Sequence, residues 1–147
     1  MSTLPQDTKM KVFIDTNILL DIIEGREKFL IPALNIFDLG MNGNIEMYAT
    51  SLTFANCMYV ARKNVGQAKA IEGLRFLKKY VKIASMDDMQ CVRALNSDMT
   101  DFEDMLQYEA ALAEGCEVIV TRDANRHFPT DTIPILSPHA FLDSLAS

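Results

Sequence analysis

Five acidic residues stand where the sequence passes from an apolar segment into a loop or a helix. Asp15 directly follows the apolar segment 12–14, and Asp123 lies just beyond the apolar segment 118–120. The remaining three open a helical segment that leads into 118–120: Asp101, Glu103 and Asp104. In open parallel sheets, ligands bind outside the carboxyl ends of the strands. If the two apolar segments form neighbouring strands, these carboxylates will meet at one edge of the sheet.

A cluster of carboxylates at a sheet edge favours one kind of chemistry. Like charges packed together repel and raise one another's pKa values, so such a cluster normally needs a cation. Oxygen ligands of this kind suit Mg²⁺ or Mn²⁺. A metal ion together with carboxylates can activate water and stabilise the charge of a phosphoryl transition state. The pattern therefore indicates hydrolytic chemistry.

Several of these acids also have a purely structural explanation. Thr100 and Glu103 fit a capping box, with Thr100 as N-cap, and Asp101 and Glu103 both gain from the helix dipole. Asp15 can cap the helix that follows it. Asp104 lies one residue beyond the capping box, so this explanation fits it less well. The functional interpretation rests on the set rather than on any single acid.

Strand and helix patterns alternate along the chain and would position these acids. Short apolar segments predict strands at 10–14, 45–50, 81–84, 117–121 and 133–136. Helical patterns predict helices at 18–24, 29–41, 51–63, 65–79, 87–96, 100–114 and 139–145. Continuous apolar strands alternating with helices indicate a parallel sheet covered on both faces. We expect an α/β fold: a single three-layer domain with a central parallel sheet of four or five strands flanked by helices.

Composition bounds the domain organisation and the compartment. With 147 residues, 49% hydrophobic and 23% charged, the chain suits one globular domain. We expect a flexible segment at 1–9 and a folded domain at 10–147. No apolar run approaches the roughly 20 residues that span a bilayer, and the first ten residues lack an apolar secretory core. These features predict a cytoplasmic protein with no membrane contact. The three cysteines are scattered, which predicts small buried side chains rather than disulfides or a zinc site.

The charge is unevenly distributed. The net charge of −6 argues against a nucleic-acid-binding protein. However, residues 62–82 hold seven basic residues and one acid, whereas 87–117 hold nine acids and one base. One segment therefore suits phosphates and the other suits cations. A solvated helix face explains the basic segment equally well.

The ordered set of motifs resembles the PIN-domain family, the fold of many bacterial toxin ribonucleases of the VapBC type. The motifs are FIDTNILLD at 13–21, DFED at 101–104, IVTRD at 119–123, HF at 127–128 and IPILSP at 133–138. The resemblance implies a divalent-metal-dependent endoribonuclease that hydrolyses single-stranded or structured RNA. It also implies a homodimer and an antitoxin partner, as in a toxin–antitoxin pair.

The resemblance also implies roles for particular residues. The catalytic acids are Asp15, Asp104 and Asp123, which hold Mg²⁺ or Mn²⁺, with Asp101 as a catalytic helper. Thr121 orients metal, water or substrate. Asn17 and Asn56 are supporting residues at the same site. Candidate RNA-binding residues are Lys63, Arg75, Lys78, Lys79, Arg122 and His127.

Two departures from the family pattern lower the negative charge of the site. Many members have a glutamate on the helix after the second strand, where this chain has Asn56. An amide oxygen can bind a hard cation but contributes no charge. In the loop after Asp123, this chain has His127 where the family usually has a second acid. Weaker metal binding, another metal preference or loss of catalysis all stay open. The alternative function is a catalytically weakened or inactive domain that binds RNA or protein.

Other enzymes of phosphate or acyl chemistry fit less well. A haloacid-dehalogenase-type phosphatase uses an Asp-x-Asp pair at a strand end, and here Asn17 takes the second place. A two-component receiver wants a lysine at the end of a late strand, where this chain has Thr121 and Ser137. No glycine-rich phosphate loop precedes a helix, and no Ser-His-Asp set stands out.

Overall fold

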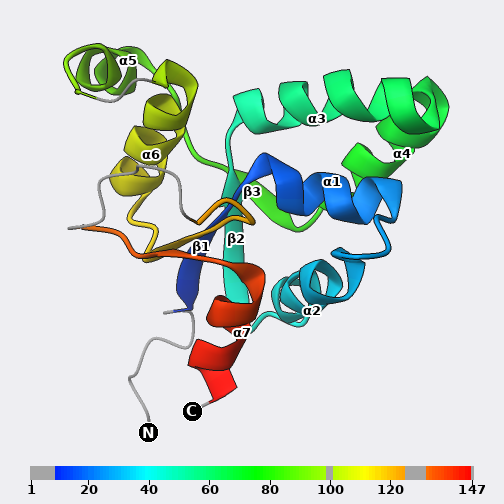
Figure 1. Ribbon diagram of the computed structural model, residues 1–147. Coiled ribbons are helices and arrows are strands. Elements are labelled where there is room, and N and C mark those ends of the chain that lie inside the picture. The colour runs from blue at the N-terminus through cyan, green and yellow to red at the C-terminus, as the bar shows by residue number, and fades with distance from the viewer. Residues whose placement is uncertain (1–8, 99–100, 125–131, 147) are drawn as a thin grey trace, which may run out of the picture.

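The computed structural model describes residues 9–98, 101–124 and 132–146 (Figure 1). All but the last residue of the predicted flexible segment 1–9 lies outside the described residues, and so does His127. No helix within the described ranges is long and apolar enough to cross a membrane.

Five parallel strands form one sheet in the order β3-β2-β1-β4-β5. They are β1 (Met10–Ile14), β2 (Ile45–Ala49), β3 (Val81–Ile83), β4 (Val118–Val120) and β5 (Ile135–Leu136). The central strand β1 pairs with β2 on one side and with β4 on the other, and Val12 lies opposite both Met47 and Val118. The predicted parallel sheet is confirmed, and the strands that precede Asp15 and Asp123 are neighbours.

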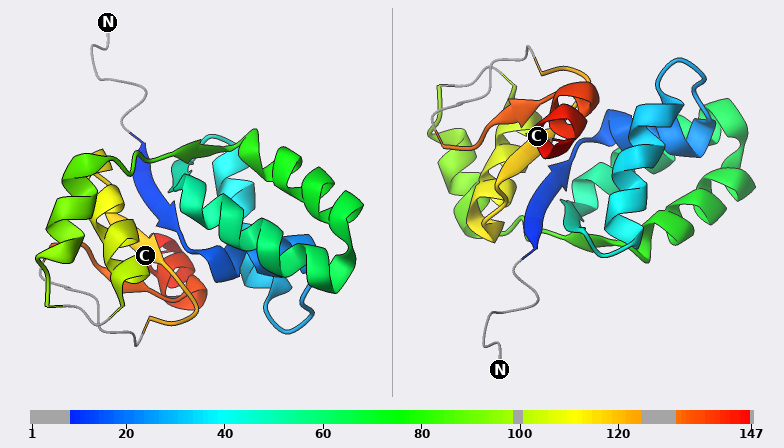
Figure 2. Two further views of the ribbon diagram at one scale, coloured as in Figure 1. Left: turned by 90° about the horizontal axis from the view of Figure 1, so that it is seen from above. Right: turned by 90° about the horizontal axis from the view of Figure 1, so that it is seen from below.

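Helices cover both faces of the sheet, as Figures 1 and 2 show. They are α1 (Thr16–Glu24), α2 (Leu30–Met41), α3 (Ser51–Val65), α4 (Gln67–Lys78), α5 (Asp88–Leu95), α6 (Phe102–Glu114) and α7 (Pro138–Ala146). Val12 and Ile14 of β1 point into a core shared with α1–α4 and Phe141 of α7. Phe13 points the other way, into a second core formed with α5 and α6. This alternation along one strand produces the three predicted layers.

The N-caps of two helices are now visible. α3 begins at Ser51, as predicted, and its N-cap is Thr50, whose hydroxyl accepts a hydrogen bond from the backbone N–H of Thr53 at 3.1 Å. Asp101 rather than Thr100 caps α6, accepting from the backbone N–H of Asp104 at 3.0 Å. The predicted capping box was therefore wrong by one residue. The shift leaves the Glu103 side chain available for another contact.

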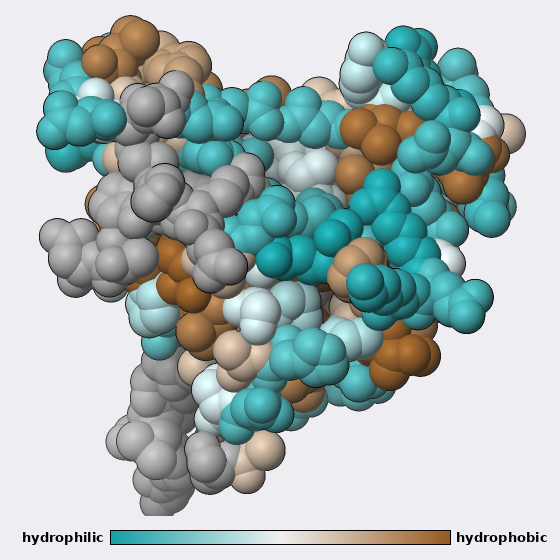
Figure 3. All heavy atoms as spheres, viewed as in Figure 1, coloured by the Kyte–Doolittle hydropathy of each residue, from teal (hydrophilic) through white to brown (hydrophobic). Residues whose placement is uncertain are grey.

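An apolar surface lies on α5. Figure 3 shows brown side chains gathered on this helix at the upper left. Met89, Val92 and Leu95 are 55%, 45% and 67% exposed. Exposed apolar side chains that gather on one element are typical of a contact with another protein chain.

The three cysteines are free, and two are buried. Burial raises the pKa of the Cys57 thiol to about 12, and the charge of Asp15 adds to the effect. Burial likewise raises the pKa of Cys116 to about 12. Because the thiolate is the reactive species, both thiols stay protonated and inert at neutral pH.

We predict that only Cys91 reacts with dithiobis(nitrobenzoate) in the native protein at about pH 8. Cys91 is partly exposed, unlike the other two. The released chromophore should correspond to one thiol in the native protein and to all three after denaturation. Rapid reaction of Cys57 or Cys116 in the folded state would contradict the described burial.

Candidate active site

A cleft of about 210 Å³ opens at the carboxyl end of the sheet. It is lined by Asp15, Thr16, Asn17, Leu20, Asn56, Glu103, Asp104, Gln107 and Asp123. These residues come from the β1–α1 junction, α3, α6 and the segment after β4. The structure thus brings the three acids predicted as metal ligands to one place, together with the two supporting asparagines.

Asp15 is held in one orientation by three donors. Its Oδ1 accepts from the backbone N–H of Thr16 at 2.8 Å, which makes it the N-cap of α1. Its Oδ2 accepts from the Thr121 hydroxyl at 2.7 Å and from the Asn17 side-chain amide at 3.4 Å. The capping role and the position in the cleft are therefore compatible, because one oxygen serves each.

Thr121 and Asn17 fix the segment that carries Asp123. The buried Thr121 hydroxyl accepts from Asn17 Nδ2 at 3.2 Å and from the backbone N–H of Asp123 at 3.1 Å. Asn17 Nδ2 also lies 3.4 Å from Asp123 Oδ2. Asn17 Oδ1 accepts from the backbone N–H of Arg122 at 3.2 Å. These bonds link the end of β1 directly to the end of β4.

The start of α6 supplies the opposite wall of the cleft. Asp104 is 9% exposed, and Gln107 is 7% exposed one turn further along. Gln107 Oε1 accepts from the hydroxyls of Thr50 and Thr53, at 3.1 and 2.8 Å. Since Thr50 caps α3, this buried group ties α6 to α3 across the sheet edge. Asp101 does not line the cleft; its carboxylate caps the helix.

Glu103 also lines the cleft. It was one of the five acids expected at the sheet edge, although helix capping also explained it and it was not among the predicted metal ligands. Its Oε1 accepts from Asn56 Nδ2 at 2.8 Å. Helical spacing also indicates its place in the cleft, because residues 103 and 107 are four positions apart and lie on the same face of the helix. The cleft therefore holds four carboxylates, and Glu103 faces the position where the family often has an acid on α3.

The donor chemistry of the cleft fits a hard divalent cation. Carboxylate and amide oxygens are the ligands that Mg²⁺ and Mn²⁺ prefer. Within the described ranges, however, no three His, Cys, Asp or Glu side chains stand close enough together to hold an ion as they are placed. The amide of Asn17 lies between Asp15 and Asp123, bonding to both. The residues that would hold a cation here are Asp15, Asp104 and Asp123, which line the cleft.

A buried ion pair anchors the same segment from the other side. Asp21 on α1 is 0% exposed and accepts from Arg122 Nε at 2.8 Å and Arg122 Nη2 at 3.2 Å. Arg26 Nη1 lies 3.4 Å from the same carboxylate. The Arg122 guanidinium also stacks on Phe29, with 3.9 Å between its Cζ and the ring centroid. These contacts fix the side chain of Arg122, the residue that precedes Asp123.

The basic residues proposed for RNA binding are spread over the molecule. Arg75 and Lys79 line a separate hollow on α4, and Lys78 is exposed on the same helix. Lys63 lies on the exposed side of α3, where its Nζ donates to the Tyr59 hydroxyl at 2.9 Å. None of these lines the carboxylate cleft. Among the candidates that the structure describes, Arg122 is the one next to a residue of the cleft, Asp123.

Substitution of Asp101 separates its capping role from a catalytic one. We expect Asp101→Ala to lower the free energy of unfolding by about 1 kcal/mol, because the helix loses its N-cap. Asp101→Ser keeps a capping oxygen and should retain both stability and any activity of the cleft. Urea unfolding and an activity assay on both variants check this. Loss of activity in the stable serine variant would indicate that the carboxylate itself takes part in catalysis.

A family model described as "PIN domain" matches residues 11–125. A curated relative, Ribonuclease VapC1 of Aquifex aeolicus (strain VF5), is 25% identical over 141 residues. The alignment covers 90% of this chain and 94% of that protein.

Solved structures share the fold at low sequence identity. VapBC2 from Rickettsia felis, bound to a DNA fragment from its promoter, has a TM-score of 0.65 at 16% identity, covering 87% of this chain and 98% of that one. VapC20 from Mycobacterium tuberculosis, a toxin that cleaves the sarcin–ricin loop, has a TM-score of 0.60 at 11% identity, covering 74% and 86%. A toxin–antitoxin complex from Klebsiella pneumoniae has a TM-score of 0.63 at 17% identity, covering 86% and 97%.

Proposed function

This chain belongs to the PIN-domain family, and from that premise we propose that it is a divalent-metal-dependent endoribonuclease. It hydrolyses phosphodiester bonds in single-stranded or structured RNA. The observation that carries the proposal is the meeting of Asp15, Asp104 and Asp123 in one cleft, from segments far apart in the chain. The relative named Ribonuclease VapC1 supports RNA as the substrate class.

Five residues in and beside the cleft have parts in this mechanism. Asp15, Asp104 and Asp123 hold the cation. When bound, Mg²⁺ or Mn²⁺ supplies a Lewis acid for the phosphoryl group and favours deprotonation of the attacking water. Thr121 orients Asp15 through the 2.7 Å hydrogen bond. Asn17 holds the segment of Asp123, because its amide oxygen accepts the Arg122 backbone N–H.

Asp101 and Glu103 support the three acids that hold the cation. Asp101 is a positioning residue, because its cap fixes the first turn of α6 and so places Asp104. Glu103 supplies the charge that Asn56 lacks, and the Asn56 amide orients it. The cleft thereby holds four acidic side chains despite the asparagine on α3.

We propose that the protein is cytoplasmic and is the toxin of a toxin–antitoxin pair. We also propose that two copies of this chain form a homodimer. One solved structure that shares its fold is a toxin–antitoxin complex from Klebsiella pneumoniae. The exposed apolar face of α5 supports a protein partner. Sedimentation of the purified chain tests the dimer, and co-expression with the neighbouring open reading frame tests the antitoxin.

The test of the enzyme is metal-dependent cleavage of a mixed single-stranded RNA pool. We expect cleavage with Mg²⁺ or Mn²⁺ and none with EDTA. Mn²⁺ should also raise the melting temperature in a concentration-dependent way, because a ligand that binds only the folded state stabilises it. The second readout reports binding without relying on turnover.

Asn56 motivates a second candidate function, a domain that binds RNA or protein without cutting. Under that alternative, the protein binds single-stranded RNA in EDTA but does not cleave it with either metal. An Asn56→Glu variant should then gain Mn²⁺-induced stabilisation, because it adds a carboxylate to the cleft. Cleavage by the unaltered protein excludes this alternative.

A further inference from the structure

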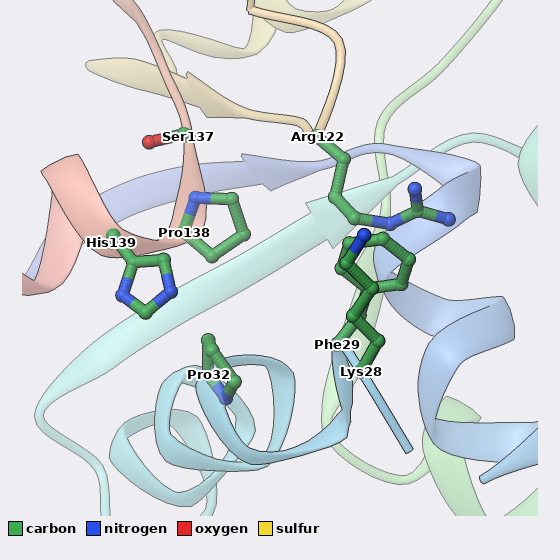
Figure 4. Close-up of a pocket in the computed structure, with 7 residues that line it drawn as sticks. All are labelled: Lys28, Phe29, Pro32, Arg122, Ser137, Pro138 and His139. Carbon is green, nitrogen blue, oxygen red and sulfur yellow. The ribbon is translucent and has the colours of Figure 1, made fainter. Parts of the chain in front are cut away.

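A second pocket is lined by Arg122, the residue that precedes Asp123 of the carboxylate cleft. Figure 4 shows the side chains that line this pocket. Its volume is about 330 Å³, and it is lined by Lys28, Phe29, Pro32, Arg122, Ser137, Pro138 and His139. The two hollows share no lining residue. Small-molecule pockets span roughly 300–1,000 Å³, so this one suits a single small ligand rather than a duplex.

The pocket is basic. Lys28 and Arg122 are cationic, His139 offers a ring N–H donor, and no acid is among the described lining residues. Arg122 is immobilised by Asp21, through Nε at 2.8 Å and Nη2 at 3.2 Å. Its pairing with Asp21 offsets part of its charge, so the exposed Lys28 is the main free cation of the pocket. These groups favour an anionic ligand.

The walls of the pocket are flat and largely apolar. In Figure 4, Phe29 and Arg122 stand on one side, Pro138 and His139 on the other, and Pro32 lies below. The Arg122 guanidinium lies against the Phe29 ring, with its Cζ 3.9 Å from the ring centroid, and Lys28 Nζ lies 5.6 Å from the same centroid. Aromatic rings and arginine planes are surfaces on which unstacked bases pack, and lysine adds the phosphate contact.

The connection between the pocket and the cleft is short. Arg122 lines the pocket, and the next residue, Asp123, lines the cleft. The backbone N–H of Arg122 is bonded to Asn17 of the cleft at 3.2 Å. Consecutive residues thus line the two hollows, which suits a single strand that passes from the carboxylates to the pocket.

We propose that this pocket binds one unstacked nucleotide of the RNA substrate, next to the phosphate that is cleaved. The base packs between Phe29 and the Pro138–His139 wall, and a phosphate meets Lys28. This inference rests on the proposed ribonuclease function and adds a substrate subsite to it.

RNA binding in EDTA tests the subsite without cleavage. The probe is a short fluorescein-labelled single-stranded RNA, titrated with Lys28→Gln, His139→Ala and the combined variant. We expect the combined variant to bind about 5- to 100-fold more weakly, as for loss of one base-stacking contact. Lys28→Gln should lower the slope of log affinity against log salt by about 0.7, the value for one phosphate contact.

Lys9→Gln is the matched control. It changes the net charge by the same amount, but Lys9 lies before β1, at the opposite end of that strand from the cleft. The control should bind RNA as the unaltered protein does. Equal weakening by Lys9→Gln and Lys28→Gln would overturn the proposal, because it would indicate a general charge effect.

Chemical-shift mapping distinguishes a nucleotide site from a simple anion site. The probes are adenosine and uridine monophosphate, with inorganic phosphate for comparison. We expect the amide signals of Phe29, Arg122 and His139 to move with the monophosphates at concentrations where phosphate alone has no effect. Equal responses to phosphate, or no response to any probe, would overturn the subsite.

The two proposals fail in different ways. If RNA is cleaved but the pocket variants leave both binding and KM unchanged, the subsite is wrong and the ribonuclease stands. If the pocket responds to mononucleotides but no metal supports cleavage, the ribonuclease is wrong and the nucleotide site stands.

Discussion

Replacing Asp15 by asparagine is expected to lower the rate of RNA cleavage by at least roughly 100-fold. Loss of an outer-sphere partner of a bound metal already costs about 10–100-fold, and Asp15 is proposed to hold the cation directly. Its carboxylate also accepts from Thr16, Thr121 and Asn17. An asparagine keeps one accepting oxygen but turns an N–H₂ group toward at least one of these donors. Asp104→Asn should have an effect of the same order.

The control for both variants is Asp38→Asn, which makes the same charge change on an exposed position of α2. We expect it to cleave RNA at the unaltered rate. Initial rates with saturating Mn²⁺ and with limiting Mn²⁺ separate lost metal affinity from lost turnover. Undiminished cleavage by Asp15→Asn, in a preparation free of other nucleases, would remove this cleft as the active site.

Replacing Arg122 by methionine should lower the free energy of unfolding by about 3 kcal/mol. Removing one partner of a buried ion pair leaves an uncompensated charge, which typically costs about 3–5 kcal/mol. The Asp21 side chain is 1% exposed and would keep only Arg26, whose side chain is 31% exposed. We place the value at the low end of that range because this second arginine remains. Urea unfolding measures the change.

Two further variants test whether the buried charge of Asp21 causes the loss of stability in Arg122→Met. Arg62→Met removes an exposed arginine of α3 and should change stability by less than about 0.5 kcal/mol. Asp21→Asn combined with Arg122→Met removes the buried charge at position 21 and should be more stable than Arg122→Met alone. A double variant that is less stable than Arg122→Met would show that Arg26 still compensates the Asp21 carboxylate, so that an uncompensated charge is not the cause.

Much of the fold followed from the sequence because its strands are continuous apolar segments bounded by polar residues. The pattern around Val12–Ile14 and Val118–Val120 located two strands of a parallel sheet, and β1 and β4 are indeed neighbours. That pairing is what brings Asp15 and Asp123 together. The ends of the helices were less certain. Asp101 stands next to the predicted cap, Thr100, and is also a residue type that caps helices, so the pattern alone did not select between the two.

The contacts around the cleft could not be predicted from spacing alone. Asp21 and Arg122 are 101 positions apart, and nothing in the sequence marks them as partners. The contact between Asn56 and Glu103 likewise depends on how α3 and α6 approach each other. The basic segment was visible as composition, but composition does not show which way Arg75, Lys78 and Lys79 face.

The pairing of β1 with β4 also governs when the cleft comes into existence. Asp15 and Thr121 are 106 positions apart, and their hydrogen bond requires that the chain between them has already folded back. Contacts of such long sequence separation form slowly, because loop closure must precede them. A nascent chain that still holds β4 inside the ribosome has Asp15 without Thr121 or Asp123. The proposed cation binding at this cleft therefore requires a chain that has been synthesised past Asp123.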